Sequence, residues 1–351
     1  MANRPETVVV FGLTPDAWKR AMVSTVLVVA VLLPFLVSDF RTFQFTLVMI
    51  WAIAVLGLNI VTGFSGQFSL GHGAFFAVGA YTAAIMMDHW EVPYYLCVPV
   101  AGLVALTAGF AFGFAAGRLA GHYLALATFA LAVAVPQILK YDPLEEWTGG
   151  VQGISLLKPD APFGLPLNPD EWLYYFVLFI TVVLFVCAGN LLRGRTGRAM
   201  MAIRDQPIAA KTMGVNVSLY KALTFGVSAM YTGIGGALYA IVIQFVSPDS
   251  FFLFVSIFIF VGMVVGGMAS IYGAIYGGLF ILFVPNIAEE ITKAAPGAIF
   301  GVIMIAFAYL VPFGVAGFAR IAGARIVRKW GVAPNGRASL GAESKQTLGG
   351  E

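Results

Sequence analysis

The sequence predicts an all-α, polytopic integral membrane protein with about ten transmembrane helices and both termini in the cytoplasm. Three observations lead to this prediction. Of the 351 residues, 60% are hydrophobic and 11% are charged, whereas soluble domains are about 45–50% apolar and about 25% charged. The mean hydropathy is +0.90, and the apolar residues form runs close to the roughly 20 residues that cross a bilayer. Basic residues gather in alternate loops.

Ten apolar runs are candidate membrane spans, and polar residues, glycine or proline interrupt the chain between them. The first run follows a polar segment that ends in Lys19 and Arg20, and it is long enough to span, so we expect no cleaved signal peptide. The runs cover residues 21–38, 44–62, 68–87, 93–117, 119–139, 172–190, 222–243, 251–268, 271–288 and 297–317.

The distribution of charge sets the expected orientation. With both termini inside, sixteen of the 20 Lys and Arg residues lie on the cytoplasmic side, in agreement with the positive-inside rule. The expected parts are a cytoplasmic segment over residues 1–20, a transmembrane domain over 21–318 with an outer loop over 140–171 and a central cytoplasmic loop over 191–221, and a tail over 319–351. The tail is polar and Gly-rich, so we expect it to be disordered.

The central loop is the longest polar interruption that has a helical composition. Residues 193–221 hold six basic residues and one acid. A turn at Asp205-Gln206-Pro207 divides the segment into two short helices, because Pro favours the first position of a helix, and Gly214 and Asn216 end the second helix. A soluble partner would contact the protein here. The alternative is a basic loop that only sets topology.

The segment over residues 63–73 interrupts two apolar runs with glycines and polar side chains. In a membrane such a break is tolerated where it is buried in protein or lines a wet cavity, and broken helices mark the paths of transporters. The alternative is a plain turn between two spans. The candidate path residues are Asn59, Gly63, Ser65, Gly66, Gln67, Ser69 and His72.

Several kinds of chemistry are not indicated. No Cys, Asp or Glu stands at metal-ligand spacing from His72 or His122, so we expect hydrogen-bonded structural histidines, no metal and no cofactor. No Lys follows a Gly, so the chain has no Walker A motif. The apolar runs contain almost no acids, which argues against an ion-coupled carrier. The basic residues lie in short loops and do not indicate nucleic-acid binding.

Several stretches of the chain carry a combination of family motifs. They are Gly57-Leu58-Asn59, residues 63–73, Gly79-Ala80-Tyr81, residues 147–154, residues 197–205, Ser247-Pro248-Asp249-Ser250 and residues 264–273. Together they resemble the branched-chain amino acid ABC permease family, in the form of its LivM-type subunit. Residues 208–214 also resemble the EAA loop of ABC importer permeases, although Ile208 stands where Glu is usual. Two further departures from the family pattern are Ala269 for a usual Gly and Ala274 for a usual Pro.

The resemblance implies a permease subunit, without catalytic residues, in a bacterial inner membrane. Its implied partners are a homologous permease subunit, two ABC ATPase subunits, a periplasmic substrate-binding protein and the lipid bilayer. The same architecture importing urea or short amides is an alternative, as is an ion-coupled carrier or channel that acts without ATPases. The residues implied to couple to the ATPases are Arg198, Arg204, Asp205, Ala209, Ala210 and Gly214.

Overall fold

A computed structural model describes residues 15–117, 119, 121–161, 168–291, 296–311, 314–319 and 321. The chain divides into two compact units, of which Leu33–Phe318 is one, and the other combines Met1–Leu32 with Ala319–Glu351. The candidate functional residues all belong to Leu33–Phe318. The tail over residues 319–351 is expected to be disordered, but all of its residues except 319 and 321 lie outside the described part of the chain.

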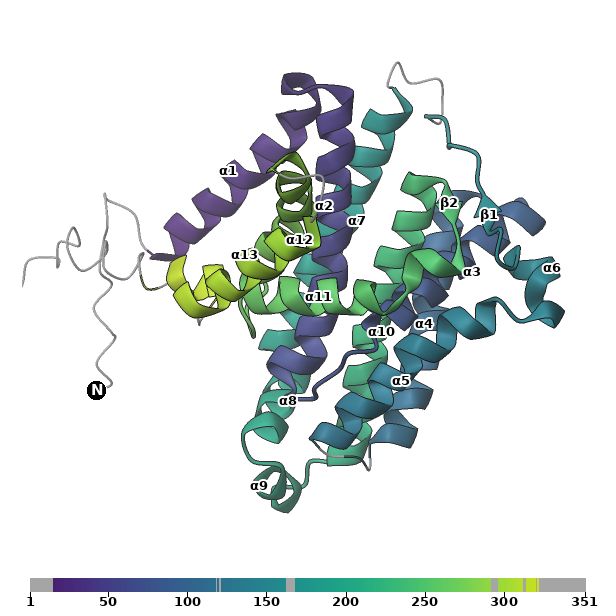
Figure 1. Ribbon diagram of the computed structural model, residues 1–351. Coiled ribbons are helices and arrows are strands. Elements are labelled where there is room, and N and C mark those ends of the chain that lie inside the picture. The colour runs from purple at the N-terminus through teal and green to yellow at the C-terminus, as the bar shows by residue number, and fades with distance from the viewer. Residues whose placement is uncertain are drawn as a thin grey trace, which may run out of the picture. The chain divides into compact units, whose positions relative to one another are not determined.

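A helix lies in each of the apolar runs that the sequence predicts to be spans (Figure 1). Within the described residues, six helical segments are long and apolar enough to cross a membrane, which confirms a helical, polytopic membrane protein. The number of ten spans stays a prediction. The long helices are α1 (Pro15–Leu36), α2 (Asp39–Leu58), α3 (His72–His89), α4 (Tyr94–Ala116), α5 (His122–Leu139), α7 (Pro169–Arg193), α10 (Val217–Ile243), α11 (Leu253–Gly266), α12 (Gly273–Ile291) and α13 (Pro296–Leu310).

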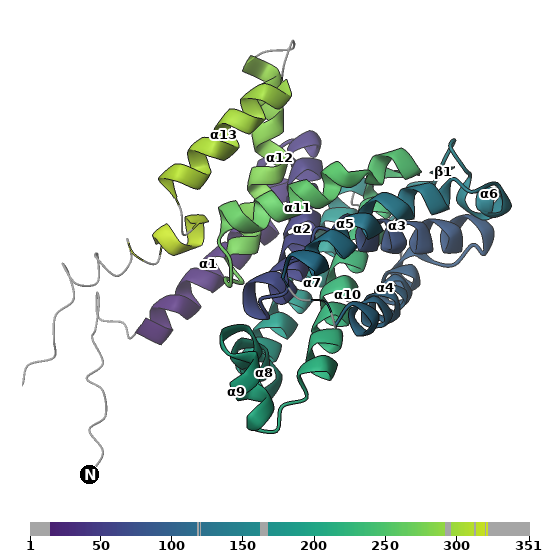
Figure 2. The same ribbon diagram turned by 60° about the horizontal axis from the view of Figure 1, so that its bottom comes forward.

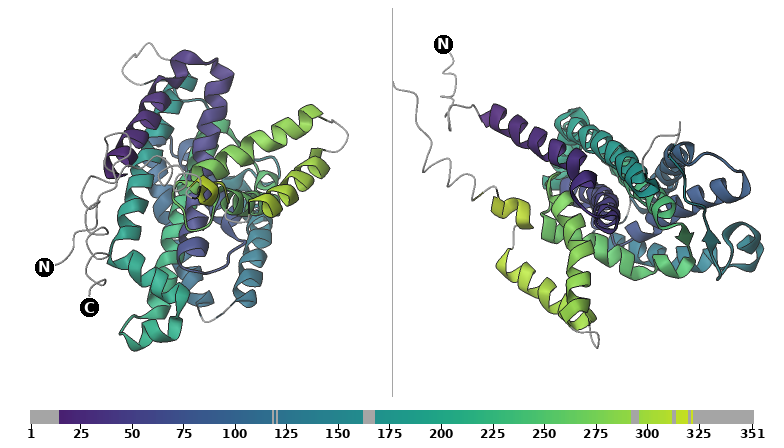
Figure 3. Two further views of the ribbon diagram at one scale, coloured as in Figure 1. Left: turned by 90° about the vertical axis from the view of Figure 1, so that its left-hand side faces the viewer. Right: turned by 90° about the horizontal axis from the view of Figure 1, so that it is seen from above.

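Shorter elements occupy the loops. The segments β1 (Ile154–Ser155) and β2 (Phe245–Val246) form an antiparallel ladder in which Ile154 lies opposite Val246, and Figure 3 shows the two strands side by side. Two residues per strand are too few to leave an alternating pattern, so the sequence did not predict this ladder. The other short elements are η1 (Asn59–Phe64), η2 (Asp142–Leu144), α6 (Glu145–Thr148), α8 (Arg195–Asp205), α9 (Pro207–Thr212) and η4 (Pro248–Phe251).

The centre of the unit is formed by α2 and α10. In the continuous segment of α2 and η1, 89% of the most apolar 18-residue stretch is buried inside the protein. In α10 the corresponding share is 78%. Small residues permit this burial: a Cβ at Gly109 in α4 would collide with Ala229 of α10, and a Cβ at Gly57 would lie 2.5 Å from the hydroxyl oxygen of Thr232. These small residues bring the backbones of α2, α4 and α10 close together.

The outer helices expose large apolar side chains, as a lipid environment allows. Phe114 of α4, Leu126 of α5 and Phe179 of α7 are all exposed in the single chain. In water such a surface would be unfavourable, whereas lipid tails and neighbouring membrane helices are apolar. On another side of the unit, α12 and α13 pack against each other as a helical hairpin (Figure 3).

Candidate functional site

The second membrane helix does not end as an α-helix. Its last turns continue into the π-helix η1, which is buried except for its final residue, and the chain then runs irregularly until α3 begins. The amide of Gly66 donates to the carbonyl of Thr62 at 3.2 Å, and the amide of Gln67 donates to the carbonyl of Val61 at 3.0 Å. The first bond spans four residues and the second spans six, so the chain closes on the end of the π-helix, an element that is rare and frequently found at functional sites.

Asn59 fastens the start of this break to the turn between α11 and α12. Its amide nitrogen donates to the carbonyl of Ser270 at 2.8 Å, and its amide oxygen accepts the backbone N–H of Ala269 at 2.8 Å. Ala269 has a φ of 56°, a conformation that is costly for a residue with a side chain. Both helix interruptions are therefore held together by one buried side chain, which satisfies backbone groups that water cannot reach.

His72 stands at the other end of the break, at the first position of α3. The hydroxyl of Ser228 in α10 donates to the carbonyl of Gly57 at 2.6 Å, so it accepts from Nε2 of His72 at 2.6 Å. Nδ1 of His72 then accepts from the hydroxyl of Ser69 at 2.9 Å, an arrangement that fits the neutral ring with its proton on Nε2. The expectation of a hydrogen-bonded structural histidine is confirmed here.

Two further hydroxyls hold the backbone between Ser69 and α3. Thr128 of α5 accepts the N–H of Leu70 at 2.9 Å, and Ser256 of α11 accepts the N–H of Gly73 at 2.9 Å. The sequence reasoning missed Thr128, Ser228 and Ser256. The only signal for each is a hydroxyl within a largely apolar helix, and such a hydroxyl does not reveal its distant partner.

The break also contacts the central loop. The guanidinium of Arg204 in α8 donates from Nη1 to the carbonyl of Gly63 at 3.1 Å and from Nε to Asp205 at 2.9 Å. Gly66 has a φ of 72°, and a Cβ there would lie 2.7 Å from Cγ of Arg204. Gln67 donates to the carbonyl of Lys221 at 3.3 Å. The structure therefore brings two sets of candidate residues together, the path residues and the coupling residues.

A cavity of about 410 Å³ opens beside this contact, between the break, α5, α8 and the start of α10. Ser65, Gly66, Gln67 and Arg204 line it, together with Lys221 and His122. The remaining candidate path residues, Asn59, Gly63, Ser69 and His72, do not line this cavity. Asn59, Ser69 and His72 direct their side chains into hydrogen bonds within the protein.

The central loop forms the two short helices that the sequence predicts, and Figure 2 shows α8 and α9 next to each other at one end of the helices. Pro207 begins α9, and Gly214 follows its end with a φ of 84°. Asn216, however, does not end the second helix. Its side-chain oxygen accepts the N–H of Leu219 at 3.1 Å, so Asn216 is the N-cap of α10, as expected for a short polar side chain at that place.

The residues implied to couple to the ATPases differ in exposure around α9. Ala210 is 5% exposed, and its carbonyl accepts the N–H of Val215, so it packs inside the loop. Gly214 is exposed and lies beyond the end of α9 at Thr212. The exposed apolar side chains of this helical turn are Ile208 (80%) and Met213 (84%). Arg198 donates to the carbonyl of Arg193 at 3.1 Å and so satisfies the end of α7.

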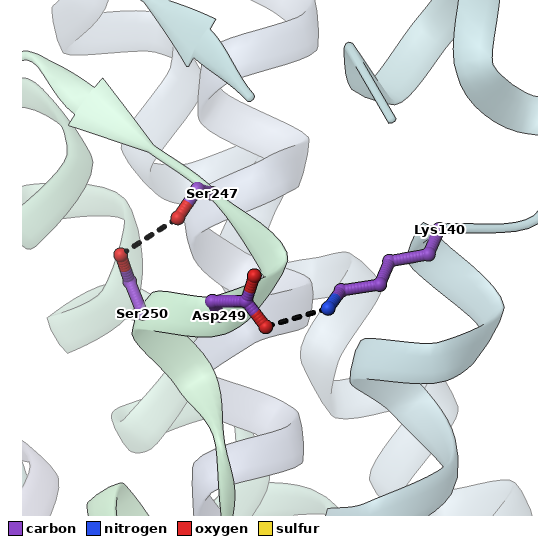
Figure 4. A network of polar contacts seen from close by, with 4 residues as sticks. All are labelled: Lys140, Ser247, Asp249 and Ser250. Carbon is purple, nitrogen blue, oxygen red and sulfur yellow. Dashed lines mark hydrogen bonds and ion pairs between the residues drawn. The ribbon is translucent and has the colours of Figure 1, made fainter. Parts of the chain in front are cut away.

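Polar contacts also join segments at the opposite end of the helices. Lys140, which follows α5, pairs with the carboxylate of Asp249 in η4 at 2.5 Å, and the hydroxyls of Ser247 and Ser250 are 3.0 Å apart (Figure 4). The Asp249 side chain is 64% exposed, so the pair contributes little to stability, about 0–1 kcal/mol. Its geometric effect is to hold the turn before α11 against the end of α5.

Comparison with known proteins identifies the family. The profile described as "Branched-chain amino acid transport system / permease component" matches residues 41–311. The high-affinity branched-chain amino acid transport system permease protein LivM of Escherichia coli (strain K12) is 34% identical over 287 residues, which cover 75% of this chain and 67% of LivM.

Two other relatives are more distant. The high-affinity branched-chain amino acid transport system permease protein BraD of Pseudomonas aeruginosa is 27% identical over 246 residues, which cover 66% of this chain and 79% of BraD. LivH of Escherichia coli (strain K12) is 26% identical over 269 residues, 71% of this chain and 83% of LivH. No solved structure matches the chain. The matched region contains the helix break, the central loop and the turn after α11, so the chain belongs to the family of branched-chain amino acid transport system permease components.

Proposed function

We propose that the chain is a transmembrane permease subunit of an ABC importer, and that it forms the path for branched-chain or related amino acids together with a second permease chain. Separate ATPase subunits drive the transport, and a periplasmic binding protein delivers the substrate. The names of the relatives support the substrate class. The match to both LivM and LivH supports a partner of similar sequence, since both are called permease proteins of such a system in one organism.

The observation that carries the mechanism is the hydrogen bond from Arg204 to the carbonyl of Gly63. It joins the central loop to the break that follows the second membrane helix. A charge-assisted hydrogen bond to a carbonyl is stronger than a neutral one and fixes direction as well as distance. A displacement of α8 by an ATPase is therefore transmitted to the π-helix without an intervening flexible segment.

The docking surface for the ATPase is the exposed side of α9. Ile208, Ala209 and Met213 lie on the surface, and two of these side chains are large and apolar. Exposed apolar side chains rimmed by charge are typical of a protein contact. Arg198 and Asp205 add charge at the rim, Ala210 packs inside the loop, and Gly214 turns the backbone after α9.

The path runs past the break, whose polar residues include Ser65 and Gln67 beside Gly66. In this proposal the ten helices all span the inner membrane as a permease domain over residues 21–318, with both termini and the coupling loop over 191–221 in the cytoplasm. The loop over 140–171 then lies in the periplasm. The distribution of basic residues supports this orientation.

The test is uptake of labelled leucine by proteoliposomes that contain the complete complex with its binding protein. Uptake that needs ATP inside the vesicles and is competed by unlabelled isoleucine supports the proposal. Uptake of labelled urea but not of leucine would show that the substrates are short amides. Leucine uptake that continues without ATPase subunits would assign the chain to carriers or channels that act alone.

A further inference from the structure

The cavity of about 410 Å³ beside the broken helix has a lining of unusual charge. Three nitrogen-bearing side chains converge on it from separate helices: His122 from α5, Arg204 from α8 and Lys221 from α10. None of the residues that line it is acidic. At neutral pH the lining therefore carries at least two positive charges, one from Arg204 and one from Lys221.

Within the residues that the structure describes, these charges are only partly balanced. Arg204 pairs with Asp205, whose side chain is largely exposed, and spends a second N–H on the carbonyl of Gly63. The ion pairs found within the described part of the chain include neither Lys221 nor His122. The first N–H groups of α5 also lie at this wall, and Gly121, the N-cap, has no side chain to accept them. Anions are stabilised at such a helix start.

Part of the lining is apolar. Phe68, Leu119 and Leu124 border the cavity, and the first two are substantially exposed in the chain. On the adjoining surface of α5, Tyr123 and Leu126 are exposed as well. An occupant with an anionic group at one end and hydrocarbon at the other fits both parts. A zwitterionic amino acid fits less well, because no carboxylate in the lining receives its ammonium group.

We propose that this cavity binds the phosphate of an anionic phospholipid such as phosphatidylglycerol, with Lys221, Arg204 and the start of α5 around the phosphate and an acyl chain against Phe68 and Leu119. Basic pockets between membrane helices take anionic headgroups in this way. Free phosphate carries the same charge, but it would leave the apolar side chains of the lining in contact with water. We therefore assign the phosphate group to a lipid. The site stands whether or not the chain imports amino acids.

The test uses the complete permease complex in nanodiscs that contain phosphatidylethanolamine and phosphatidylglycerol in equal amounts. After extraction into detergent, native mass spectrometry counts the lipids that stay bound. We expect the wild type to retain phosphatidylglycerol selectively. Lys221→Gln should lower this occupancy about fivefold, since one Lys contributes about 1 kcal/mol to binding an anionic lipid. Lys211→Gln removes the same charge from the surface of α9, outside the cavity, and should leave the occupancy unchanged.

A second pair of variants covers the case in which Lys221→Gln does not assemble. Leu119→Asp places a negative charge in the lining and should abolish selective retention, whereas Leu157→Asp, in the outer loop, should not. Equal retention by Lys221→Gln and Lys211→Gln would overturn the site. So would equal retention of phosphatidylethanolamine by the wild type. Thermal stabilisation by inorganic phosphate in discs without phosphatidylglycerol, lost in Lys221→Gln, would overturn the lipid in favour of free phosphate.

Discussion

Nη1 of Arg204 lies 3.1 Å from the carbonyl oxygen of Gly63, a residue 141 positions earlier in the chain. The carbonyl belongs to the π-helix that ends the second membrane helix, and the arginine belongs to the central loop. A loop that only set topology would need positive charge but no such directed contact. The contact gives the loop a mechanical connection to the membrane domain.

Replacing Arg204 tests this connection. Arg204→Gln should reduce ATP-dependent uptake about tenfold or more, because a hydrogen bond from a charged group is worth about 1.5–3 kcal/mol and about 1.4 kcal/mol corresponds to tenfold. ATP hydrolysis should continue, since the ATPase surface on α9 is intact. The readouts are uptake and hydrolysis in the same proteoliposomes. Arg195→Gln, which removes an exposed arginine at the first position of the same helix, is the control, and an equal loss in both variants would argue against a specific role.

Gly66 occupies a position that only glycine fits. Its φ is 72°, and a Cβ would lie 2.7 Å from Cγ of Arg204. Gly66→Ala should therefore lower uptake severalfold by displacing Arg204, while the complex still assembles. Gly189→Ala is the matched control, because a Cβ at this helical glycine meets nothing within 4 Å. Normal uptake by Gly66→Ala would reduce the break to an ordinary turn.

The exposed side of α9 should bind the ATPase. Ile208→Asp places a charge in the centre of the proposed contact, so we expect the ATPase subunits to be lost on co-purification. The membrane domain should be unaffected, because the Ile208 side chain is exposed. Ser218→Asp adds the same charge to an exposed position in the first turn of α10 and should retain the ATPase subunits. ATPase subunits that remain bound to the Ile208 variant would move the contact elsewhere.

Ala269 is a site where the protein should be stabilised by losing a methyl group. Its φ of 56° costs about 1–2 kcal/mol for a residue with a Cβ, and glycine removes most of that cost. Ala269→Gly should raise the free energy of unfolding by about 0.5–1 kcal/mol after the greater entropy of an unfolded glycine is included. Thermal unfolding in detergent measures the change. Ala274→Gly, within α12, should destabilise the protein, and the same sign in both variants would contradict the explanation.

The orientation can be tested with single cysteines. Cys97 and Cys187 are first replaced, and Leu157→Cys and Met213→Cys are then compared, because these side chains are 91% and 84% exposed. An impermeant thiol reagent should label position 157 from the periplasm and position 213 only in inverted vesicles. Labelling of both from the same side would exclude the proposed orientation.

The helices were predictable because each apolar run has about the length of a membrane span and because Pro, Gly and polar residues mark the loops between the runs. Pro207 marks the start of α9, and the glycines from Gly63 to Gly73 mark the interruption after α2. The start of α7 was also readable: Asn168 and Glu171 form a capping box there, although the sequence reasoning placed the run later, at residue 172.

The partners of the polar side chains were not predictable. Asn59 bonds to Ser270, 211 positions away, and nothing in either local pattern names the other. Ala210 illustrates a second difficulty. A small residue suits both an outward contact and a tight inward one, and in the structure Ala210 is buried. The turn before α9 was predictable from Pro207, but the direction in which the α9 side chains face was not.

The two hydrogen bonds of Asn59 determine which segments should be exchanged together when chimeras of homologous permeases are made. Asn59 holds the backbone at Ala269 and Ser270, so the region after α2 and the turn after α11 form one unit assembled from two distant parts of the chain. A chimera that takes residues 56–73 from a relative but keeps the native turn separates a side chain from the backbone shape it fits. Functional swaps between homologous subunits should therefore transfer residues 267–273 with the helix break, as a pair.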